Sequence, residues 1–377
     1  MKTELFLSQL QRELGIDFYT GVPDSQLKSL CDTLYEKYGV SDSHIVAANE
    51  GGAVGLAAGH YLGTGKPALV YLQNSGLGNM VNPVASLLNE KVYGIPCFFV
   101  IGWRGEPGVK DEPQHIFQGE ITIRMLEVMD ISYLILTKNT SKQEWMTFVD
   151  QCKELFLQGK SVAVVICKGA LQAECNAIYS NNNSLTREDA VRCIVSSSGD
   201  EDIFVSTTGK TSRELYEIRE QLKQGHEKDF LTVGSMGHAL MIAMGIAKSQ
   251  RDRAVWCIDG DGAAVMHLGS LVVAAQSGCK NLLHIIINNG AHESVGGMPV
   301  AQGRADLGAI AEAAGYQKCF RADSKESLEK SLTSAKQSDG PILIEILTAI
   351  GSRDNLGRPK TTPSQNKWAL MNFIKKD

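Results

Sequence analysis

The sequence lacks long apolar runs and has no excess of positive charge. No stretch of eighteen apolar residues occurs, so we expect no membrane span. The N-terminus, MKTELFLSQLQREL, is amphipathic and has no apolar core of the kind that a signal peptide carries. The net charge of −5 argues against a nucleic-acid partner. Neither membrane nor nucleic acid is therefore expected to bind this protein.

Paired cysteines are also missing. The chain has nine cysteines but no C-x-x-C pair. An odd, unpatterned set in a chain of this size favours buried free thiols over a disulfide framework or a zinc site. Such thiols are typical of a reducing compartment, so a cytoplasmic location is predicted.

Two nucleotide-binding motifs are absent. An NAD-dependent dehydrogenase would carry G-x-G-x-x-G at the start of a helix, and GLGN at 76–79 matches only half of it. A P-loop needs an earlier glycine than TTGKTS at 207–212 provides. The dehydrogenase class is therefore disfavoured, and the P-loop class is rejected.

Short apolar runs that alternate with helical patterns fill the chain. Its 377 residues are enough for two domains, and a 43% hydrophobic share is ordinary for globular proteins. The expected strands are 44–49, 68–73, 96–103, 131–136, 161–167, 202–207, 254–259, 282–288 and 341–347. The expected helices include 50–63, 141–156, 268–278 and 324–337. This order predicts an α/β fold with two parallel sheets.

The pattern pauses at 168–185, where KGALQAECNAIYSNNNSL has no periodicity. We interpret this stretch as a linker between domains at 1–170 and 186–377. No repeat of short period is visible.

The second domain carries DGDG at 259–262, directly after an apolar strand, and Asn288-Asn289 follow the next one. The interval 263–287 holds one helix and one strand, so it places Asp261 and Asn289 at adjacent strand ends. A carboxylate and an amide oxygen suit Mg²⁺, and the flanking glycines let a diphosphate approach the backbone. Gly-Asp-Gly alone could equally be an ordinary turn. With the Asn pair at this spacing, a metal and diphosphate site is the favoured interpretation and a turn is the lesser alternative.

The GDG…NN pattern resembles the signature of thiamine-diphosphate-dependent enzymes. The resemblance implies that the Asp261 and Asn289 side chains and the Ala291 carbonyl hold Mg²⁺. It places Gly260, Gly262 and Ala263 against the diphosphate. The segment VGSMGHA at 233–239 resembles the one that holds the aminopyrimidine, through the Gly234 carbonyl and the Met236 side chain. Plain core packing is the other interpretation of Met236.

The first domain matches a second motif of the same family, E-x-x-A-x-x-x-A-x-G, at Glu50, Ala53, Ala57 and Gly59. The resemblance implies that Glu50 donates to N1′ of the pyrimidine. Without the resemblance, a glutamate that begins a helix is more often a dipole partner or a cap.

Two further segments of this domain resemble active-site turns of the family's decarboxylase branch. In GVPDSQLKSL, at 21–30, Ser25 or Asp24 would face the substrate, although Asp24 could be only a turn residue. In QNSGLGNMVNP, at 73–83, Gly76 would lie near the thiazolium.

The family resemblance also bears on architecture. It implies a pyrimidine-type and a diphosphate-type domain, and the middle domain of many relatives is missing here. In the family, the glutamate-bearing domain of one subunit covers the diphosphate-bearing domain of another, so at least a homodimer is expected.

The resemblance implies a small anionic 2-oxoacid substrate, and two basic loops bear on which one it is. Residues 101–119 hold Arg104, Lys110 and His115, and residues 351–363 hold Arg353, Arg358 and Lys360. Any one of these side chains could be merely solvated, but two such loops favour a substrate with a second anion.

These loops, with NNGAHESVGGMP at 288–299, resemble the phosphonopyruvate decarboxylase branch of the family. The branch decarboxylates 3-phosphonopyruvate to phosphonoacetaldehyde and CO₂ in phosphonate biosynthesis; sulfopyruvate decarboxylases are the alternative. His115 and His292 are the candidates for proton transfer, because imidazole titrates near neutrality. The other histidines, His284 among them, show no ligand spacing.

Overall fold

The computed structural model describes residues 1–301 and 305–375. It divides into two compact units. Unit 1 is built from Met1–Ile178, with Val295–Ala301 clustering beside it, and unit 2 holds Tyr179–Ser294 and the described residues from Ala305 onward. The expected linker, 168–185, contains no helix or strand. The predicted boundaries of 1–170 and 186–377 stay a prediction, and their residues 302–304, 376 and 377 lie outside the described part.

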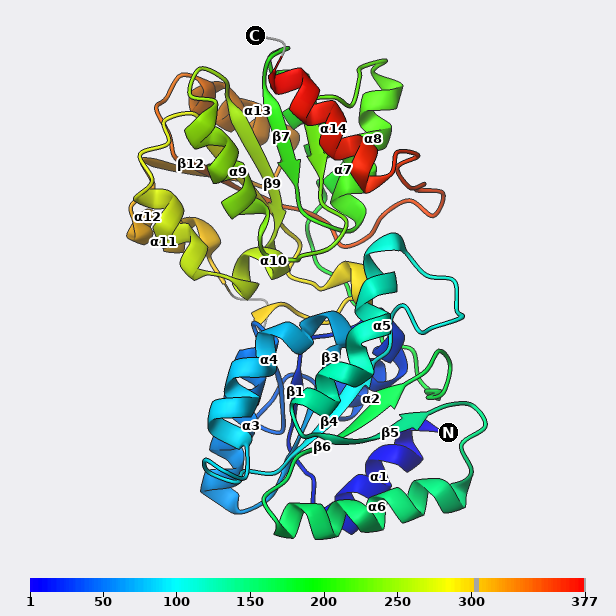
Figure 1. Cartoon of the computed structure of the whole chain (residues 1–377). Helices are drawn as coiled ribbons and strands as arrows, with labels where there is room; N and C mark the ends of the chain where they lie inside the picture. Colours follow the sequence, from blue (N-terminus) through cyan, green and yellow to red (C-terminus); the bar gives the residue numbers. More distant parts are fainter. Residues whose placement is uncertain (302–304, 376–377) are drawn as a thin grey trace. The chain divides into compact units, whose positions relative to one another are not determined.

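Unit 1 is organised around one six-stranded sheet in the order β2-β1-β3-β4-β6-β5 (Figure 1). All of its pairings are parallel. The strands are β1 (Tyr19–Gly21), β2 (His44–Val46), β3 (Ala68–Gln73), β4 (Cys97–Gly102), β5 (Ser132–Leu136) and β6 (Val162–Ile166).

Helices cover both faces of this sheet. They are α1 (Thr3–Leu14), α2 (Lys28–Tyr38), α3 (Glu50–Thr64), α4 (Leu77–Pro83), α5 (Pro113–Val128) and α6 (Lys142–Leu157). Two short 3₁₀ turns, η1 (Ser25–Leu27) and η2 (Asn74–Gly76), and one π-helical segment, η3 (Val84–Leu88), lie between them.

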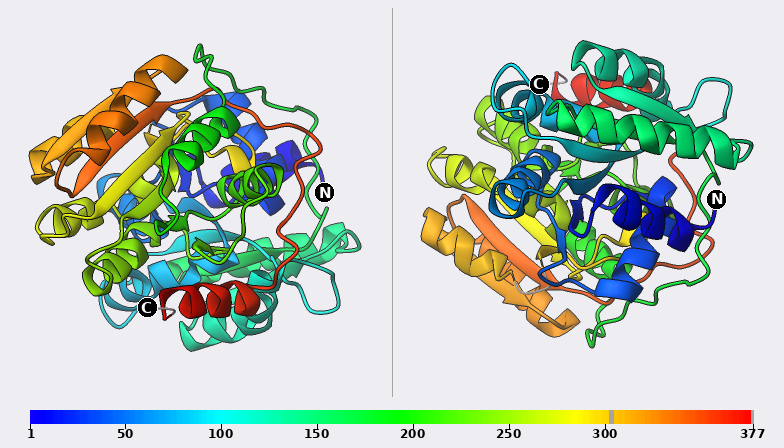
Figure 2. Two further views of the ribbon diagram at one scale, coloured as in Figure 1. Left: turned by 90° about the horizontal axis from the view of Figure 1, so that it is seen from above. Right: turned by 90° about the horizontal axis from the view of Figure 1, so that it is seen from below.

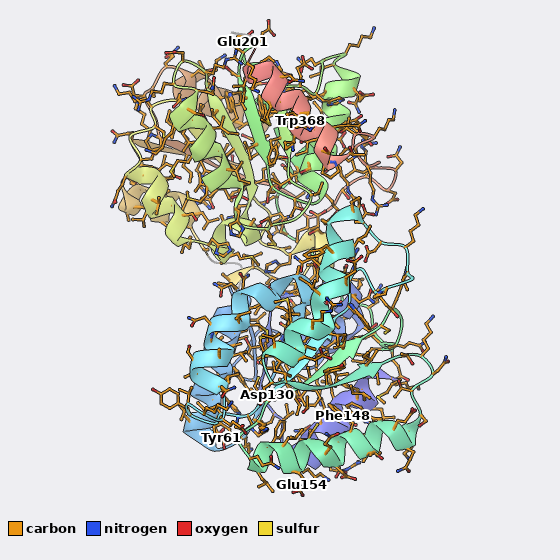
Figure 3. The ribbon with its side chains drawn as sticks, viewed as in Figure 1. Tyr61, Asp130, Phe148, Glu154, Glu201 and Trp368 are labelled. Atoms are coloured by element: carbon orange, nitrogen blue, oxygen red, sulfur yellow. The ribbon has the colours of Figure 1, made fainter. Side chains whose placement is uncertain are left out.

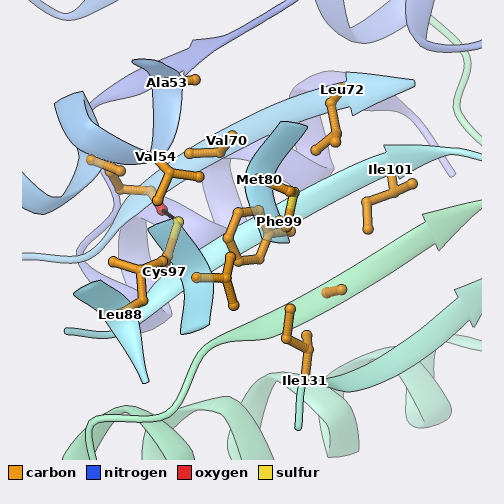
Figure 4. Packing of buried hydrophobic residues seen from close by; sticks show 14 of the residues in the cluster. Ala53, Val54, Val70, Leu72, Met80, Leu88, Cys97, Phe99, Ile101 and Ile131 are labelled. Atoms are coloured by element: carbon orange, nitrogen blue, oxygen red, sulfur yellow. Dashed lines mark hydrogen bonds between the residues drawn. The ribbon is translucent and has the colours of Figure 1, made fainter. Parts of the chain in front are cut away.

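Apolar side chains from both sides of β4 fill the two cores of unit 1. On one side, Phe99 and Ile101 pack with Met80 of α4 and Val54 of α3 (Figure 4). On the other side, Phe98 meets Phe6 of α1, which contacts Trp145 of α6. The amphipathic α6 buries Phe148 and exposes Glu154 (Figure 3). A strand buried on both faces explains the continuous apolar run of β4.

Unit 2 contains a second six-stranded parallel sheet, in the order β11-β12-β10-β9-β7-β8. Its strands are β7 (Ile203–Ser206), β8 (Asp229–Leu231), β9 (Val255–Gly260), β10 (Leu282–Asn288), β11 (Lys318–Ala322) and β12 (Ile342–Leu347). Counted from the first strand of each unit, both sheets have the order 2-1-3-4-6-5.

Helices again cover both faces (Figure 2). One face carries α7 (Arg187–Ser197), α8 (Lys210–Gln221) and α13 (Lys325–Lys336). The other carries α9 (Ala239–Ser249), α10 (Asp261–Met266), α11 (Gly269–Ala275), α12 (Leu307–Ala314) and α14 (Pro363–Ile374), and η4 (Glu293–Val295) follows β10. Among the described residues, no helix has both the length and the hydrophobicity that a bilayer span requires.

The α/β prediction is confirmed, and each of the nine expected strands is present. Three strands were not expected: β1, β8 and β11. The first two have only three residues each, and β11 is an edge strand whose sequence, KCFRA, mixes charged with apolar side chains and has no continuous apolar run. A pattern search for apolar runs passes over such segments.

Each sheet has a point at which the strand order reverses. The chain order changes direction between β1 and β3 in unit 1, and between β7 and β9 in unit 2. Ligands of open α/β sheets bind beside such switch points, at the carboxyl ends of the strands. The segments after β1, β3, β7 and β9 are therefore the first place to look for a site.

The edge strand β8 is held by a buried ion pair. Arg219 of α8 donates through Nε and Nη2 to the Asp229 carboxylate, at 3.1 and 2.8 Å. Both side chains are fully buried, and the guanidinium lies 4.7 Å from the centre of the Phe204 ring. Burial raises the pKa of Asp229, although Arg219 opposes this shift. The pair therefore ties the start of β8 to α8.

We expect Arg219→Met to lower the free energy of unfolding of unit 2 by about 3–5 kcal/mol, because it leaves Asp229 buried without its cation. Chemical denaturation followed by fluorescence in a variant that keeps Trp256 as its only tryptophan measures the change. The double variant Arg219→Met/Asp229→Leu, which removes both charges, should recover most of the loss. Equal destabilisation in the single and double variants would contradict the pairing.

Candidate active site

Glu50 begins α3 at the carboxyl edge of the unit 1 sheet. Asn49 caps the helix by accepting from the Gly52 amide at 2.8 Å. The Glu50 side chain is only 4% exposed, and Asn79 Nδ2 donates to its Oε2 at 2.7 Å. A side-chain carbon on Gly76 would overlap the same carboxylate. Gly76 thus lies directly against Glu50, and Asn79 is a partner that the sequence search missed.

Asp24 and Ser25 follow β1 and point to different partners. Asp24 is fully buried, caps η1 through the Gln26 amide at 3.0 Å, and accepts from Gln73 Nε2 at 2.5 Å. Burial raises the pKa of this carboxyl, so it takes up a proton more readily than an ordinary aspartate. Ser25 instead accepts from Arg104 Nη1 at 2.9 Å. Asp24 is therefore a buried turn-capping residue, whereas Ser25 is exposed and binds Arg104.

Asp111 organises the loop after β4, although no sequence pattern singled it out. It accepts from Arg104 Nε and Nη2 at 2.8 and 2.5 Å, and from the Gly105 and Glu112 amides, both at 2.8 Å. His115 Nδ1 lies 3.0 Å from the same carboxylate. Burial opposes ionisation, but Arg104 and His115 outweigh it and hold the pKa of Asp111 well below its usual range.

This arrangement brings the predicted Arg104 and His115 together. The segment 101–119 is a loop only as far as Glu112, since α5 starts at Pro113 and carries His115. Asp111 accepts from both Nε and Nη2 of Arg104. The pair of donors that we expected to bind a substrate anion is therefore already used within the chain. Lys110, beside it, is exposed.

The short turn η2 joins these two groups of residues. Asn74 receives the Arg104 amide at Oδ1, at 3.1 Å, and its Nδ2 donates to the Arg104 carbonyl at 2.8 Å. Two residues later, Gly76 packs on Glu50. One polar surface therefore runs along the ends of β1, β3 and β4 to the start of α3.

In unit 2, Asp261 and Asn289 follow the neighbouring strands β9 and β10, as predicted. The strands pair in parallel with Gly260 opposite Ile287. Asp261 Oδ2 accepts from the Gly290 amide at 2.7 Å, and Oδ1 accepts from the Gly262 amide at 2.8 Å. The Asn289 Oδ1 atom accepts from the Ala291 amide at 3.0 Å. The Ala291 carbonyl accepts from the Glu293 amide at 2.8 Å.

Asp261 is a buried carboxylate without a cation beside it. Its side chain is 6% exposed, and burial raises its pKa to about 7 despite the two amide hydrogen bonds. Among the described residues, no Lys, Arg or His forms an ion pair with it within 4.0 Å. A divalent ion would compensate this charge, and the carboxylate, amide and carbonyl donors are the types that Mg²⁺ accepts.

Gly262 lies between two predicted side chains. A side-chain carbon at this position would be 3.0 Å from His292 Cε1 and 3.4 Å from Met236 Cε. The segment that holds Gly234 and Met236 therefore converges on the Gly-Asp-Gly turn, which also includes Gly260 and Ala263. Thr207, at the end of β7, lies 4.0 Å from the corresponding point on Gly260.

Burial changes what His292 can do. The side chain is 8% exposed, and burial lowers its pKa to about 4. It is therefore neutral near pH 7, and the near-neutral titration on which its selection was based does not apply.

A buried ionic network supports Asn289, and the sequence search missed it. Asn289 Nδ2 donates to Glu293 Oε2 at 2.8 Å. Glu293 also accepts from Arg187 Nη1 at 2.7 Å and from Lys210 Nζ at 2.9 Å, and Arg187 pairs with Glu214. Burial opposes ionisation of Glu293, but Arg187 and Lys210 outweigh it and lower its pKa. Lys210 belongs to the TTGKTS segment that was rejected as a P-loop.

The second basic loop, residues 351–363, does not present all three of its predicted cations as free side chains. Arg353 donates to Glu188 at 3.0 Å and also pairs with Glu217, so its charge is compensated within unit 2. Arg358 and Lys360 are exposed. Of the three predicted cations, Arg353 is thus bound to helices α7 and α8.

Two family models match most of the chain. The thiamine pyrophosphate enzyme N-terminal TPP binding domain matches residues 1–126, and the C-terminal TPP binding domain matches residues 207–346. The solved structure of benzoylformate decarboxylase from Polynucleobacter necessarius aligns with 92% of this chain and 99% of its own, at 12% identity and a TM-score of 0.39. So low a score supports no conclusion.

Full-length relatives carry decarboxylase names. The phosphonopyruvate decarboxylase of Streptomyces viridochromogenes is 34% identical over 96% of this chain and 92% of its own. That of Streptomyces hygroscopicus is 34% identical over 93% and 89%. The sulfopyruvate decarboxylase of Methanosarcina acetivorans is 28% identical over 95% and 94%. The chain therefore belongs to the family of thiamine-diphosphate-dependent decarboxylases, in the two-domain branch that includes the phosphonopyruvate decarboxylases.

Proposed function

We propose that this protein decarboxylates 3-phosphonopyruvate to phosphonoacetaldehyde and CO₂, as a step of phosphonate biosynthesis. The observation that carries the proposal is 34% identity to phosphonopyruvate decarboxylases along nearly the whole chain. Sulfopyruvate is the alternative substrate, supported by 28% identity to a full-length sulfopyruvate decarboxylase. The residues at the two sheet edges fit either substrate, because both carry a second anionic group.

The unit 2 edge fits Mg²⁺ and a diphosphate. Asp261, Asn289 and the Ala291 carbonyl are the proposed metal ligands, with Glu293 as the group that orients Asn289. The small residues Gly260, Gly262 and Ala263 leave the backbone open to the diphosphate. When bound, thiamine diphosphate supplies the nucleophilic carbon and the electron sink for the loss of CO₂.

Glu50 is the proposed partner of the pyrimidine ring. Its carboxyl group is nearly excluded from water, and Asn79 leaves Oε1 available while it binds Oε2. A carboxyl group held in this way can share a proton with a ring nitrogen. Gly234 and Met236 are the proposed contacts on the other side of the cofactor, and Gly76 is the proposed contact near the thiazolium.

Residues of the unit 1 cluster are the proposed substrate contacts. Burial raises the pKa of Asp24, so this carboxyl takes up a proton more readily than an ordinary aspartate, and Ser25 can donate a hydrogen bond. His115 is the better of the two candidates for proton transfer, since His292 is neutral and fits a hydrogen-bonding role. Lys110, Arg358 and Lys360 are the proposed cations for the second anion, and Arg104 would first have to leave Asp111. Arg353 would first have to leave Glu188 and Glu217.

The assembly and location remain proposals too. The family resemblance supports at least a homodimer, in which each cofactor contacts two subunits. All nine cysteines are free thiols, which supports a reducing compartment such as the cytoplasm.

A side-by-side assay with thiamine diphosphate and Mg²⁺ tests the substrate. We expect kcat/KM to be highest for phosphonopyruvate, lower for sulfopyruvate and lowest for pyruvate. Preference for sulfopyruvate would reassign the substrate and leave the cofactor roles unchanged.

The Lys110→Ala variant tests the proposed anion site. It should lower kcat/KM for phosphonopyruvate about tenfold or more, from the loss of a charge-assisted hydrogen bond of ~1.5–3 kcal/mol. Pyruvate turnover should change little, and the exposed Lys91→Ala serves as the control. Arg353→Ala should affect both substrates equally, because its ion pairs support the fold.

Asp261→Asn should weaken the binding of Mg²⁺ with thiamine diphosphate by more than about 100-fold. The wild-type affinity should also fall as the pH drops below about 7, because the raised pKa lets a proton compete with the metal for this carboxylate. Titration calorimetry at several pH values measures both effects. The exposed Asp252→Asn is the control. Unchanged affinity in folded Asp261→Asn would exclude Asp261 as a ligand.

Glu50→Gln should keep the fold and the cofactor affinity, since the amide oxygen can still accept from Asn79. The rate of C2-proton exchange on bound thiamine diphosphate should fall by roughly 10²–10⁴-fold, the usual range for loss of an acid–base group. Quenched exchange read by NMR gives this rate. Glu154→Gln, on the exposed side of α6, should exchange at the wild-type rate, and so would Glu50→Gln if Glu50 were only a helix cap.

A further inference from the structure

Three side chains that bind metals well are buried together in unit 2, outside the residues assigned above. Cys257 and Asp259 lie on β9, and His284 lies on the adjacent β10, directly opposite Cys257 in the sheet register. Alternation along each strand places all three on the face that α9 to α12 cover. Their exposures are 0%, 2% and 0%.

The three potential ligand atoms are close enough to share one ion. The Cys257 Sγ atom, a carboxylate oxygen of Asp259 and a ring nitrogen of His284 all lie within 4.8 Å of one another. His284 Nε2 is 3.7 Å from Asp259 Oδ2. Tetrahedral Zn²⁺, with bonds of about 2.0–2.3 Å, keeps its ligands roughly 3.3–3.8 Å apart. The existing spacing therefore needs only a small contraction around an ion.

The imidazole is oriented as it is in a metal site. His284 Nδ1 lies 3.2 Å from the Tyr316 hydroxyl, and a ligating histidine characteristically hydrogen-bonds its second nitrogen in this way. The other nitrogen, Nε2, is fully buried and has no hydrogen-bond partner among the described residues. It points to a carboxylate and a thiol at a distance too long for a hydrogen bond. A cation between these groups would satisfy all three.

We propose that Cys257, Asp259 and His284 bind one Zn²⁺ ion. Sulfur and imidazole donors favour zinc over Mg²⁺, which prefers oxygen. The ion would join β9 to β10 upstream of Asp261 and Asn289, which directly follow these strands, and would therefore support the cofactor edge. Three protein ligands leave one tetrahedral position for a small ligand such as water. This site does not depend on the identity of the substrate.

The metal content of the full-length protein, purified without a histidine tag and dialysed against Mg²⁺ buffer, tests the proposal. We expect about one zinc per chain by mass spectrometry. Cys257→Ser and His284→Gln, which approximately preserve side-chain shape, should each lower the zinc content per chain at least tenfold. Cys279→Ala, a buried thiol of the same unit, and Asp261→Asn should both retain it. Loss in Asp261→Asn alone would place the zinc at the magnesium site and overturn the proposal.

Cobalt gives a second, spectroscopic readout of the cysteine ligand. Protein refolded with one equivalent of Co²⁺ should show the thiolate-to-cobalt absorption that a cysteine ligand produces, and Cys257→Ser should not. Wild-type protein that contains no zinc and shows no such absorption would overturn the proposal. Asp259 and His284 would then be a buried carboxylate and imidazole that lie close together without a metal.

Discussion

The positions of all the functional candidates follow from the parallel arrangement of strands in each sheet. When every strand runs in one direction, every carboxyl end lies at the same edge, and each loop that leaves this edge begins from a buried, rigid position. In unit 1, this edge receives Asp24 and Ser25 after β1, Gly76 after β3 and Arg104 after β4. In unit 2, it receives Thr207, Asp261 and Asn289 after β7, β9 and β10. Both sheets have the same strand order, so the same edge is used twice with different side chains.

Charge compensation separates the structural from the functional carboxylates. Asp111, Asp229 and Glu293 each have an arginine partner within the chain. Such pairs fix loops and strands in place, because a buried charge is tolerated only when it is paired. Asp261 accepts from backbone amides, forms no ion pair among the described residues and has a raised pKa, which are properties expected of a carboxylate that binds a cation from outside. The same reasoning applies to the unpaired Nε2 atom of His284.

Two carboxylates at the carboxyl edge of the unit 1 sheet pack directly against glycines. A side chain at Gly76 would overlap the Glu50 carboxylate, and one at Gly102 would overlap that of Asp24. Both carboxylates are therefore held against the backbone of a neighbouring strand end, where water has little access. A glycine-rich segment that reads as a flexible turn is in this case a contact surface for a carboxylate.

The sequence by itself determined the α/β class, the nine apolar strands and the adjacency of Asp261 to Asn289. These features depend on local patterns: apolar runs, helical periodicity and the length of one strand-helix-strand unit. The family of the chain could be read from its motifs for the same reason. The three missed strands, β1, β8 and β11, are too short or too polar to leave such a pattern.

Only the tertiary structure decided which partners each side chain has. Asp111 acts on Arg104 and His115, and Glu293 acts on Asn289, through contacts that no motif encodes. Arg353 looked like a free cation of a basic loop until α7 and α8 supplied Glu188 and Glu217. Cys257 and His284 have no ligand spacing along the chain and become neighbours only because β9 pairs with β10. Burial, which lowers the pKa of His292 and raises that of Asp261, depends on the packing of the whole unit, so no local pattern contains it.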